Sequence, residues 1–154
     1  MNAIVKSPIG RLFGGFIRMG EQIPEWPVYL GLRVWIAKVF WDSGQTKILD
    51  WDNTIFLFED VYMVPLVPAE WAAYAATTFE LAMPVFLVVG LATRLAALPL
   101  LGMTMVIHFL VFPMWMPGGQ WAEFVIWLSI LTLLATRGPG SFSIDHLVRG
   151  KFGN

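Results

Sequence analysis

The sequence predicts an all-α protein, an integral membrane four-helix bundle with short amphipathic helices on its surface. Of its 154 residues, 57% are hydrophobic and 14% are charged, whereas soluble domains are about half apolar and about a quarter charged. Two apolar runs, residues 69–92 and 95–113, each reach the roughly 20 residues that cross a bilayer's hydrocarbon core. Eight tryptophans are typical of aromatic belts at the membrane interfaces. We therefore expect one membrane domain over residues 1–154.

Residues 1–26 are predicted to form a basic amphipathic segment on the membrane surface. Apolar side chains recur on one helical face, and Arg11 and Arg18 fall on the opposite one. This distribution favours a helix lying in the interface. Because chain termini are often disordered, a frayed basic terminus is the alternative interpretation.

The first predicted span, residues 28–43, is the most polar of the four. It contains Arg33, Lys38 and Asp42. Lys38 and Asp42 are one turn apart and share a face. Arg33 lies about 140° around the helix from Lys38, so the two cations can have different partners. We expect this helix to be the most enclosed one or to line a polar cavity.

Residues 44–68 are predicted to form an acidic connection that contains one short amphipathic helix. The helix is expected from Ile55 to Met63, with the sequence Asp52-Asn53-Thr54 providing its N-cap. The prolines that follow, at positions 65 and 68, end it before the second span.

The second and third spans, residues 69–92 and 95–113, form a predicted antiparallel hairpin. Glu80 lies near the middle of the second span, where a charge costs roughly 2.5–3.5 kcal/mol on insertion scales. The ring of Pro84 clashes with the backbone carbonyl four residues earlier, that of Glu80, and leaves this carbonyl without its helical hydrogen bond. The carboxylate therefore needs a partner, a proton or a function.

The fourth span is predicted over residues 120–136, after a Pro-Gly-Gly turn, and a tail follows over residues 137–154. Within the tail, Ser143 is expected to cap a surface helix. The N-terminal segment, the link at Arg94 and the tail are basic, and the connection at residues 44–68 is acidic. By the positive-inside rule, both termini and the tail are expected to be cytoplasmic.

Depth along the helices, at 1.5 Å per residue, predicts two clusters of ligand-binding candidates. One pairs Glu80 with Lys38 at mid-membrane, with Arg33 as the fallback partner. The other places Asp42, His108 and Glu123 near the outer mouth of the bundle. The mid-membrane pair is interpreted either as a structural ion pair or as a site for a quinone head group or a relayed proton. His108 is either an interhelical hydrogen-bonding residue or a proton donor.

Several function classes are disfavoured by the sequence. It contains no cysteine, so thiol chemistry and thiolate metal sites are excluded. A metal site is not expected, because His108 and His146 should lie on opposite sides of the membrane and no paired-ligand spacing occurs. We find no phosphate loop or nucleophile elbow and assign no catalytic residue. The net charge of −1 gives no reason to expect a nucleic-acid partner.

The order of these features resembles the DoxX family of small four-span bacterial membrane proteins, over roughly residues 28–148. The most specific parts are the link Gly90-Leu91-Ala92-Thr93-Arg94 and the closing stretch Arg137-Gly138-Pro139-Gly140-Ser141-Phe142-Ser143-Ile144-Asp145. The family is associated with membrane subunits of oxidoreductases, including a thiosulfate:quinone oxidoreductase. The resemblance implies a multi-pass protein of the bacterial inner membrane, with quinone as a candidate cofactor and no covalently bound group.

Two function classes stay open. In the first, the protein is a quinone-interacting or accessory membrane subunit of an oxidoreductase complex, whose redox centre resides in a partner. In the second, it is a non-enzymatic membrane partner, an assembly factor or a small carrier. The expected partners are the lipid bilayer and other membrane or redox subunits, or further copies of the chain.

Overall fold

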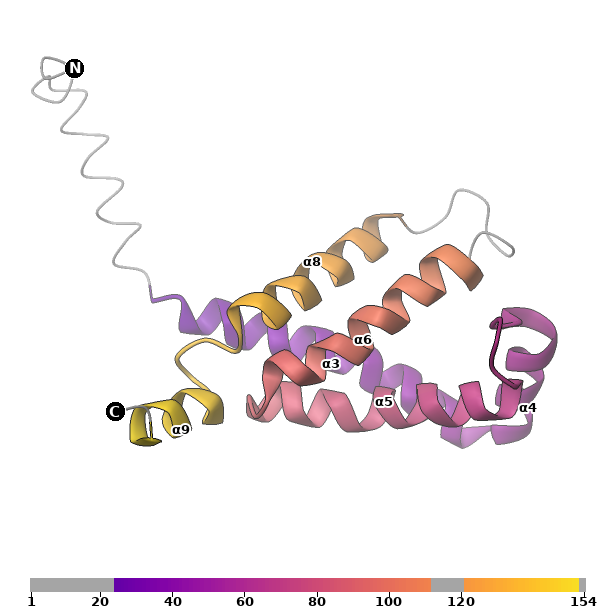
Figure 1. Cartoon of the computed structure of the whole chain (residues 1–154), viewed down its shortest axis with the longest axis horizontal. Coiled ribbons are helices and arrows are strands. Elements are labelled where there is room, and N and C mark those ends of the chain that lie inside the picture. Colours follow the sequence, from indigo (N-terminus) through magenta and orange to yellow (C-terminus); the bar gives the residue numbers. More distant parts are fainter. Residues whose placement is uncertain (1–23, 112–120, 153–154) are drawn as a thin grey trace, which may run out of the picture.

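A computed structural model describes residues 24–111 and 121–152. Within these residues every regular element is helical, which confirms the all-α class (Figure 1). The elements are α3 (Trp26–Leu49), α4 (Trp51–Phe56), the π-helix η1 (Leu57–Tyr62), α5 (Ala69–Val89), α6 (Thr93–Val106), the π-helix η2 (Ile107–Val111), α8 (Trp121–Arg137) and α9 (Ile144–Phe152).

The four long helices pack around one apolar core. α3 packs against α5, α5 against α6, and α6 against α8, while α8 also contacts α3. In Figure 1, α4 lies at one end of the bundle and α9 at the other. Fully buried side chains from all four helices fill the centre, among them Ile36, Leu87, Leu100, Leu131 and Leu134. The interior is thus packed like that of a soluble helical bundle, and the features typical of a membrane protein lie on the outer surface.

The outer surface of the bundle is apolar. Large side chains on α5 and α6 are exposed, including Val85, Val88, Leu95 and Leu98. Two helical stretches, Ala69–Val89 and Thr93–Val111, are long and apolar enough to cross a membrane, with mean hydropathies of 1.6 and 1.8. Exposed apolar side chains on such helices are suited to lipid contact. The structure is therefore that of a helical membrane bundle.

The first long helix differs from the sequence prediction in length. α3 continues to Leu49, past the expected end of the first span at residue 43, so Lys47 is a helical residue. The next helix starts earlier than expected, because the Asp50 carboxylate, and not the Asp52-Asn53-Thr54 sequence, accepts the capping hydrogen bond from the Asn53 amide at 3.0 Å. α4 then passes directly into η1.

The α5–α6 link depends on one glycine. Gly90 has φ +74° and ends α5, its amide donating to the Phe86 carbonyl at 2.9 Å. A Cβ atom on Gly90 would lie 2.7 Å from Nη2 of Arg33 and 2.6 Å from Cβ of Ser143. Both the left-handed backbone and this close packing require glycine. The N-terminal segment, apart from its last residues, and the predicted turn at residues 114–119 lie outside the described residues.

Candidate functional site

Glu80 is buried against the C-terminal half of α3. Lys47 Nζ lies 2.8 Å from Oε2 and 3.0 Å from Oε1, with hydrogen-bond geometry to Oε1. The Ser43 hydroxyl donates to Oε1 at 3.2 Å and accepts from Lys47 Nζ at 2.9 Å. The side chains of Lys47 and Glu80 are 16% and 3% exposed. The carboxylate thus has the basic partner that its depth requires, held by a three-residue network.

The predicted pairing of Glu80 with Lys38 is wrong. Lys38 lies on the outward face of α3, where it pairs with Asp42 one turn later, and both side chains are more than half exposed. Residues that face α5 and the core follow the helical spacing Arg33, Phe40, Gly44, and Lys47 continues it one turn beyond Gly44. The prediction compared only the depths of the residues in the membrane and not their angular positions around the helix. It also ended the span at residue 43, so Lys47 was not considered part of the helix.

Arg33, the fallback partner, does not contact Glu80 either. The residue is 1% exposed, and its guanidinium group donates to four backbone carbonyls. Nε donates to the Leu87 carbonyl at 2.7 Å, and Nη2 donates to that of Val88. Nη1 donates to the carbonyls of Pro139 and Phe142 at 3.1 and 2.7 Å. A cation at the C-terminal end of α5 is favoured by the helix dipole. Arg33 therefore joins α5 to the segment between α8 and α9, and its donors are engaged there.

His108 lies on η2 among aromatic rings. It stacks on Phe124, with ring centroids 3.7 Å apart and planes 13° apart, and Trp121 approaches edge-on at 4.3 Å. The residue is 7% exposed, and its Nδ1 atom has no hydrogen-bond partner among the described residues. The interhelical hydrogen bond that the sequence suggested is thus not seen at Nδ1.

The predicted outer cluster of Asp42, His108 and Glu123 is not formed by direct contacts. Asp42 is engaged by Lys38, and Glu123 is exposed. Within residues 24–111 and 121–152, no hydrogen bond or ion pair joins any two members of the cluster. The reason is again angular, because Asp42 and Glu123 point outward from α3 and α8 while His108 points inward.

Two further polar residues extend the Glu80 network. Burial, and then the Glu80 carboxylate, raise the pKa of Tyr62, at the end of η1, above its ordinary value. The Thr77 hydroxyl, one turn before Glu80 on the same face of α5, is buried without a hydrogen-bond partner among the described residues. η1 contacts both α5 and η2. We call Ser43, Lys47, Thr77, Glu80 and Tyr62 the Glu80 site, with His108 on the neighbouring π-helix.

The chemistry of this region follows from its donors and acceptors. A lysine and a serine hydroxyl contact the carboxylate, and a threonine on the same face of α5 and a phenol on η1 add further polar groups. The Glu80 site can therefore hold a polar head group or a mobile proton. Of its five members, only Glu80 was identified from sequence. Lys47 and Ser43 could have been found from the helical spacing that links them to Phe40, whereas Tyr62 needed the fold of α4 and η1. Among the described residues no group of three or more potential ligand side chains could hold a metal ion.

Comparison with known proteins gives one match. The family model DoxX matches residues 28–113, which include α3, the connection, α5, α6 and η2, and thus the whole Glu80 site and His108. The match ends before α8. No curated protein and no solved structure matches the chain.

Proposed function

Because the chain belongs to the DoxX family of membrane proteins, we propose that it is a quinone-interacting membrane subunit of an oxidoreductase complex in the bacterial inner membrane. The proposal rests on one observation: two buried polar atoms have no partner among the described residues, one in the Glu80 site and one on η2, which contacts η1. These atoms are Nδ1 of His108 and the hydroxyl oxygen of Thr77. Buried polar groups are normally paired, so each of these atoms is free, within the described part of the chain, to bind a ligand.

A quinone head group suits this region chemically. It is a flat ring with two carbonyl acceptors, and the aromatic side chains around His108 offer faces and edges for such a ring. Tyr62 and Thr77 carry hydroxyl donors, and His108 can donate through Nδ1 in the appropriate tautomer. Two π-helices in contact with each other also favour this location, since π-helical turns occur often at functional sites.

In this proposal, residues of this chain bind and transfer protons, and a partner subunit transfers the electrons. Glu80, Lys47 and Tyr62 can hold or pass a proton. The sequence has no cysteine to hold an iron–sulfur cluster. The partner subunit therefore carries the redox centre in this proposal.

Binding of a short-chain benzoquinone to the detergent-purified protein tests the proposal, with quenching of tryptophan fluorescence as the readout because Trp121 touches His108. His108→Phe keeps an aromatic ring against Phe124 and removes Nδ1. Losing one hydrogen bond worth about 0.5–1.5 kcal/mol should weaken binding by about two- to tenfold. Glu80→Gln should weaken it also.

Lys38→Met is the control, because it removes a charge on the outward face of the same bundle. It should leave quinone affinity unchanged. If the wild type shows no saturable quenching, or if all three variants bind as the wild type does, the chain is not a quinone-binding subunit.

A second candidate function, a non-enzymatic membrane partner or assembly factor, is favoured by the Lys38–Asp42 pair. The pair lies near the middle of α3, and its side chains are 71% and 58% exposed. Charges at this depth normally face a bundle interior or a polar partner. A helix of another subunit covering this face would remove the pair from lipid.

Crosslinking distinguishes this candidate from the first. A photoreactive residue at the exposed Trp41, which neighbours the pair on α3, should capture another membrane protein in intact cells. The same residue at Val85 on the apolar face of α5 is the control. Equal capture from both positions, or none from either, contradicts a docking face on α3.

A further inference from the structure

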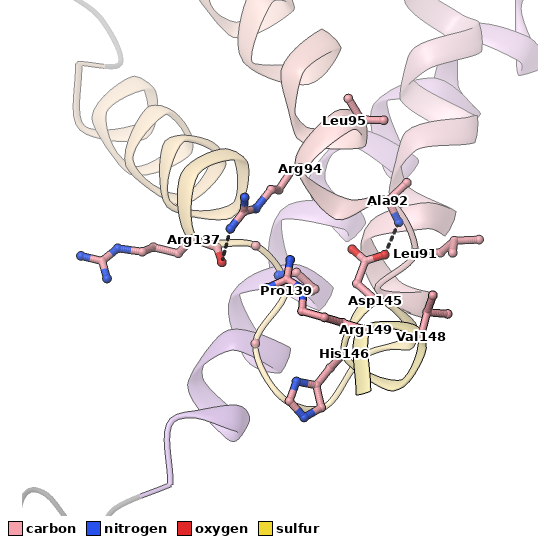
Figure 2. Close-up of a pocket in the computed structure, with 12 residues that line it drawn as sticks. Leu91, Ala92, Arg94, Leu95, Arg137, Pro139, Asp145, His146, Val148 and Arg149 are labelled. Carbon is pink, nitrogen blue, oxygen red and sulfur yellow. Dashed lines mark hydrogen bonds between the residues drawn. The ribbon is translucent and has the colours of Figure 1, made fainter. Parts of the chain in front are cut away.

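A second polar feature lies where α5 ends and α6 begins. The α5–α6 link, the start of α6, the segment between α8 and α9, and α9 itself enclose a pocket of about 540 Å³ (Figure 2). It is separate from the Glu80 site, shares no residue with it, and is built partly from the C-terminal region that lies beyond the family match at residues 28–113.

The walls of the pocket are fixed to the bundle. The Asp145 carboxylate accepts hydrogen bonds from the amides of Ala92 and Thr93 at 2.7 and 3.0 Å, and the Asp145 amide donates to the Gly90 carbonyl at 2.9 Å. Arg33 holds the segment between α8 and α9 from the other side. The pocket is therefore a built feature of the fold and does not depend on a loose tail.

Its lining is basic. Three arginines, Arg94, Arg137 and Arg149, line it together with His146, and the lining contains one carboxylate, Asp145. Both oxygens of that carboxylate already accept backbone amides. Among the described residues none of these arginines forms an ion pair. The described lining thus has three arginines against one carboxylate and is positively charged overall.

The arginines are not equivalent. In Figure 2, Arg137 points away from the other labelled side chains, and its carbonyl accepts a hydrogen bond from Arg94 Nη2 at 3.4 Å. Arg94 and Arg149 come from different elements, α6 and α9, and both line the pocket. These two guanidinium groups are the cations best placed to bind an anion between the helices.

Aliphatic side chains border the same pocket. Leu91, Leu95 and Val148 line it and are 40%, 70% and 47% exposed. Leu95 belongs to the first turns of a helix apolar enough to cross a membrane, so the pocket lies at one end of a candidate span. A ligand here meets arginines on one side and an apolar helix surface on the other.

We propose that this pocket binds the phosphate group of an anionic membrane phospholipid, with the acyl chains running along the exposed face of α6. Guanidinium groups form paired hydrogen bonds to phosphate oxygens, and basic pockets beside membrane helices bind lipid head groups. A free phosphate would use the same arginines. The exposed leucines favour the lipid, because they can contact acyl chains but cannot form hydrogen bonds or ion pairs with a soluble anion.

Native mass spectrometry of the full chain in detergent, titrated with phosphatidylglycerol or phosphatidylcholine, tests the proposal. The wild type should bind phosphatidylglycerol in preference. Arg94→Gln and Arg149→Gln should each raise the dissociation constant about fivefold, since a basic residue contributes about 1 kcal/mol to such binding. Arg149→Gln removes no side-chain hydrogen bond seen among the described residues, so it tests the site even if Arg94→Gln disturbs the link.

Lys151→Gln is the matched control, because it removes one positive charge from α9 outside the pocket lining. It should change the dissociation constant less than twofold. An equal loss with Lys151→Gln, or equal affinity of the wild type for the two lipids, overturns the proposal in favour of diffuse attraction. Displacement of bound lipid by millimolar inorganic phosphate overturns it in favour of a soluble anion.

Discussion

The contact between Glu80 and Lys47 predicts a specific pattern of stability in a double-mutant cycle. Glu80 is buried, Lys47 is partly buried, and the Ser43 hydroxyl bridges them. Removing one partner of such a pair leaves an uncompensated buried charge, which typically costs about 3–5 kcal/mol. Glu80→Gln and Lys47→Met should therefore each lower the free energy of unfolding in mixed micelles by about that amount.

The double variant separates pairing from general damage. With both charges gone, no unpaired ion stays buried, so the double variant should be more stable than the sum of the two losses predicts, by about 2–3 kcal/mol. The Ser43 hydroxyl can still donate to the amide oxygen that Glu80→Gln puts in place of the carboxylate. Unfolding would be followed by circular dichroism as the fraction of denaturing detergent rises.

Lys38 provides the control for the same cycle. Lys38→Met also removes a lysine from α3, but its partner is the exposed Asp42, and exposed pairs contribute about 0–1 kcal/mol. Lys38→Met should show no coupling to Glu80→Gln. Additive losses for Lys47 and Glu80, or coupling of Glu80 to Lys38 instead, would refute the pairing described above.

Three further predictions concern the rest of the bundle. Arg33→Gln should lower the free energy of unfolding by roughly 3–5 kcal/mol, because it unpairs carbonyls at the end of α5 and in the segment between α8 and α9. Arg33→Lys, which lacks the planar guanidinium group, should recover only part of the loss. Gly90→Ala should cost at least about 1–2 kcal/mol from its φ of +74°, whereas Gly31→Ala, whose Cβ would meet open space, should be neutral or slightly stabilising in the same assay. The pKa of Tyr62 is raised by burial and then by Glu80, so the stabilising contribution of Tyr62 is complete below pH about 10 and is lost as pH rises through the folded-state pKa. Tyr62→Phe should reduce this loss of stability at high pH. Glu80→Gln should lower the pH at which the phenolate absorbance assigned to Tyr62 appears.

The fold was predictable because a membrane limits the choices. Runs of about 20 apolar residues are long enough to cross a bilayer as helices, and α5 and α6 with η2 lie where those runs lie. The DoxX resemblance was confirmed by the family match over residues 28–113, which includes the link at Gly90–Arg94 and ends before the closing stretch. Helix ends were less predictable, since α3 passes residue 43 through side chains that are polar but still pack on α5.

The partners of the charged residues were predictable only in part. A need for a basic partner follows from the sequence position of Glu80 alone, and that need is met. Which residue is the partner depends on angular position around the axis of α3. Lys47 lies on the face toward Glu80, whereas Lys38 lies on the outward face. The role of Arg33 could not be read from charge at all, because its acceptors are backbone carbonyls brought together by the turn at Gly90 and the segment after α8.

The charged residues of α3 fall into two groups that differ in their partners. On the face toward α5, Arg33 finds carbonyls and Lys47 finds a carboxylate, so both cations are satisfied within the chain. On the outward face, Lys38 and Asp42 find only each other among the described residues. The expectation that a polar span must be enclosed thus holds for one face of the helix. The same helix therefore contains both satisfied internal cations and an exposed ion pair, and only its angular positions separate the two.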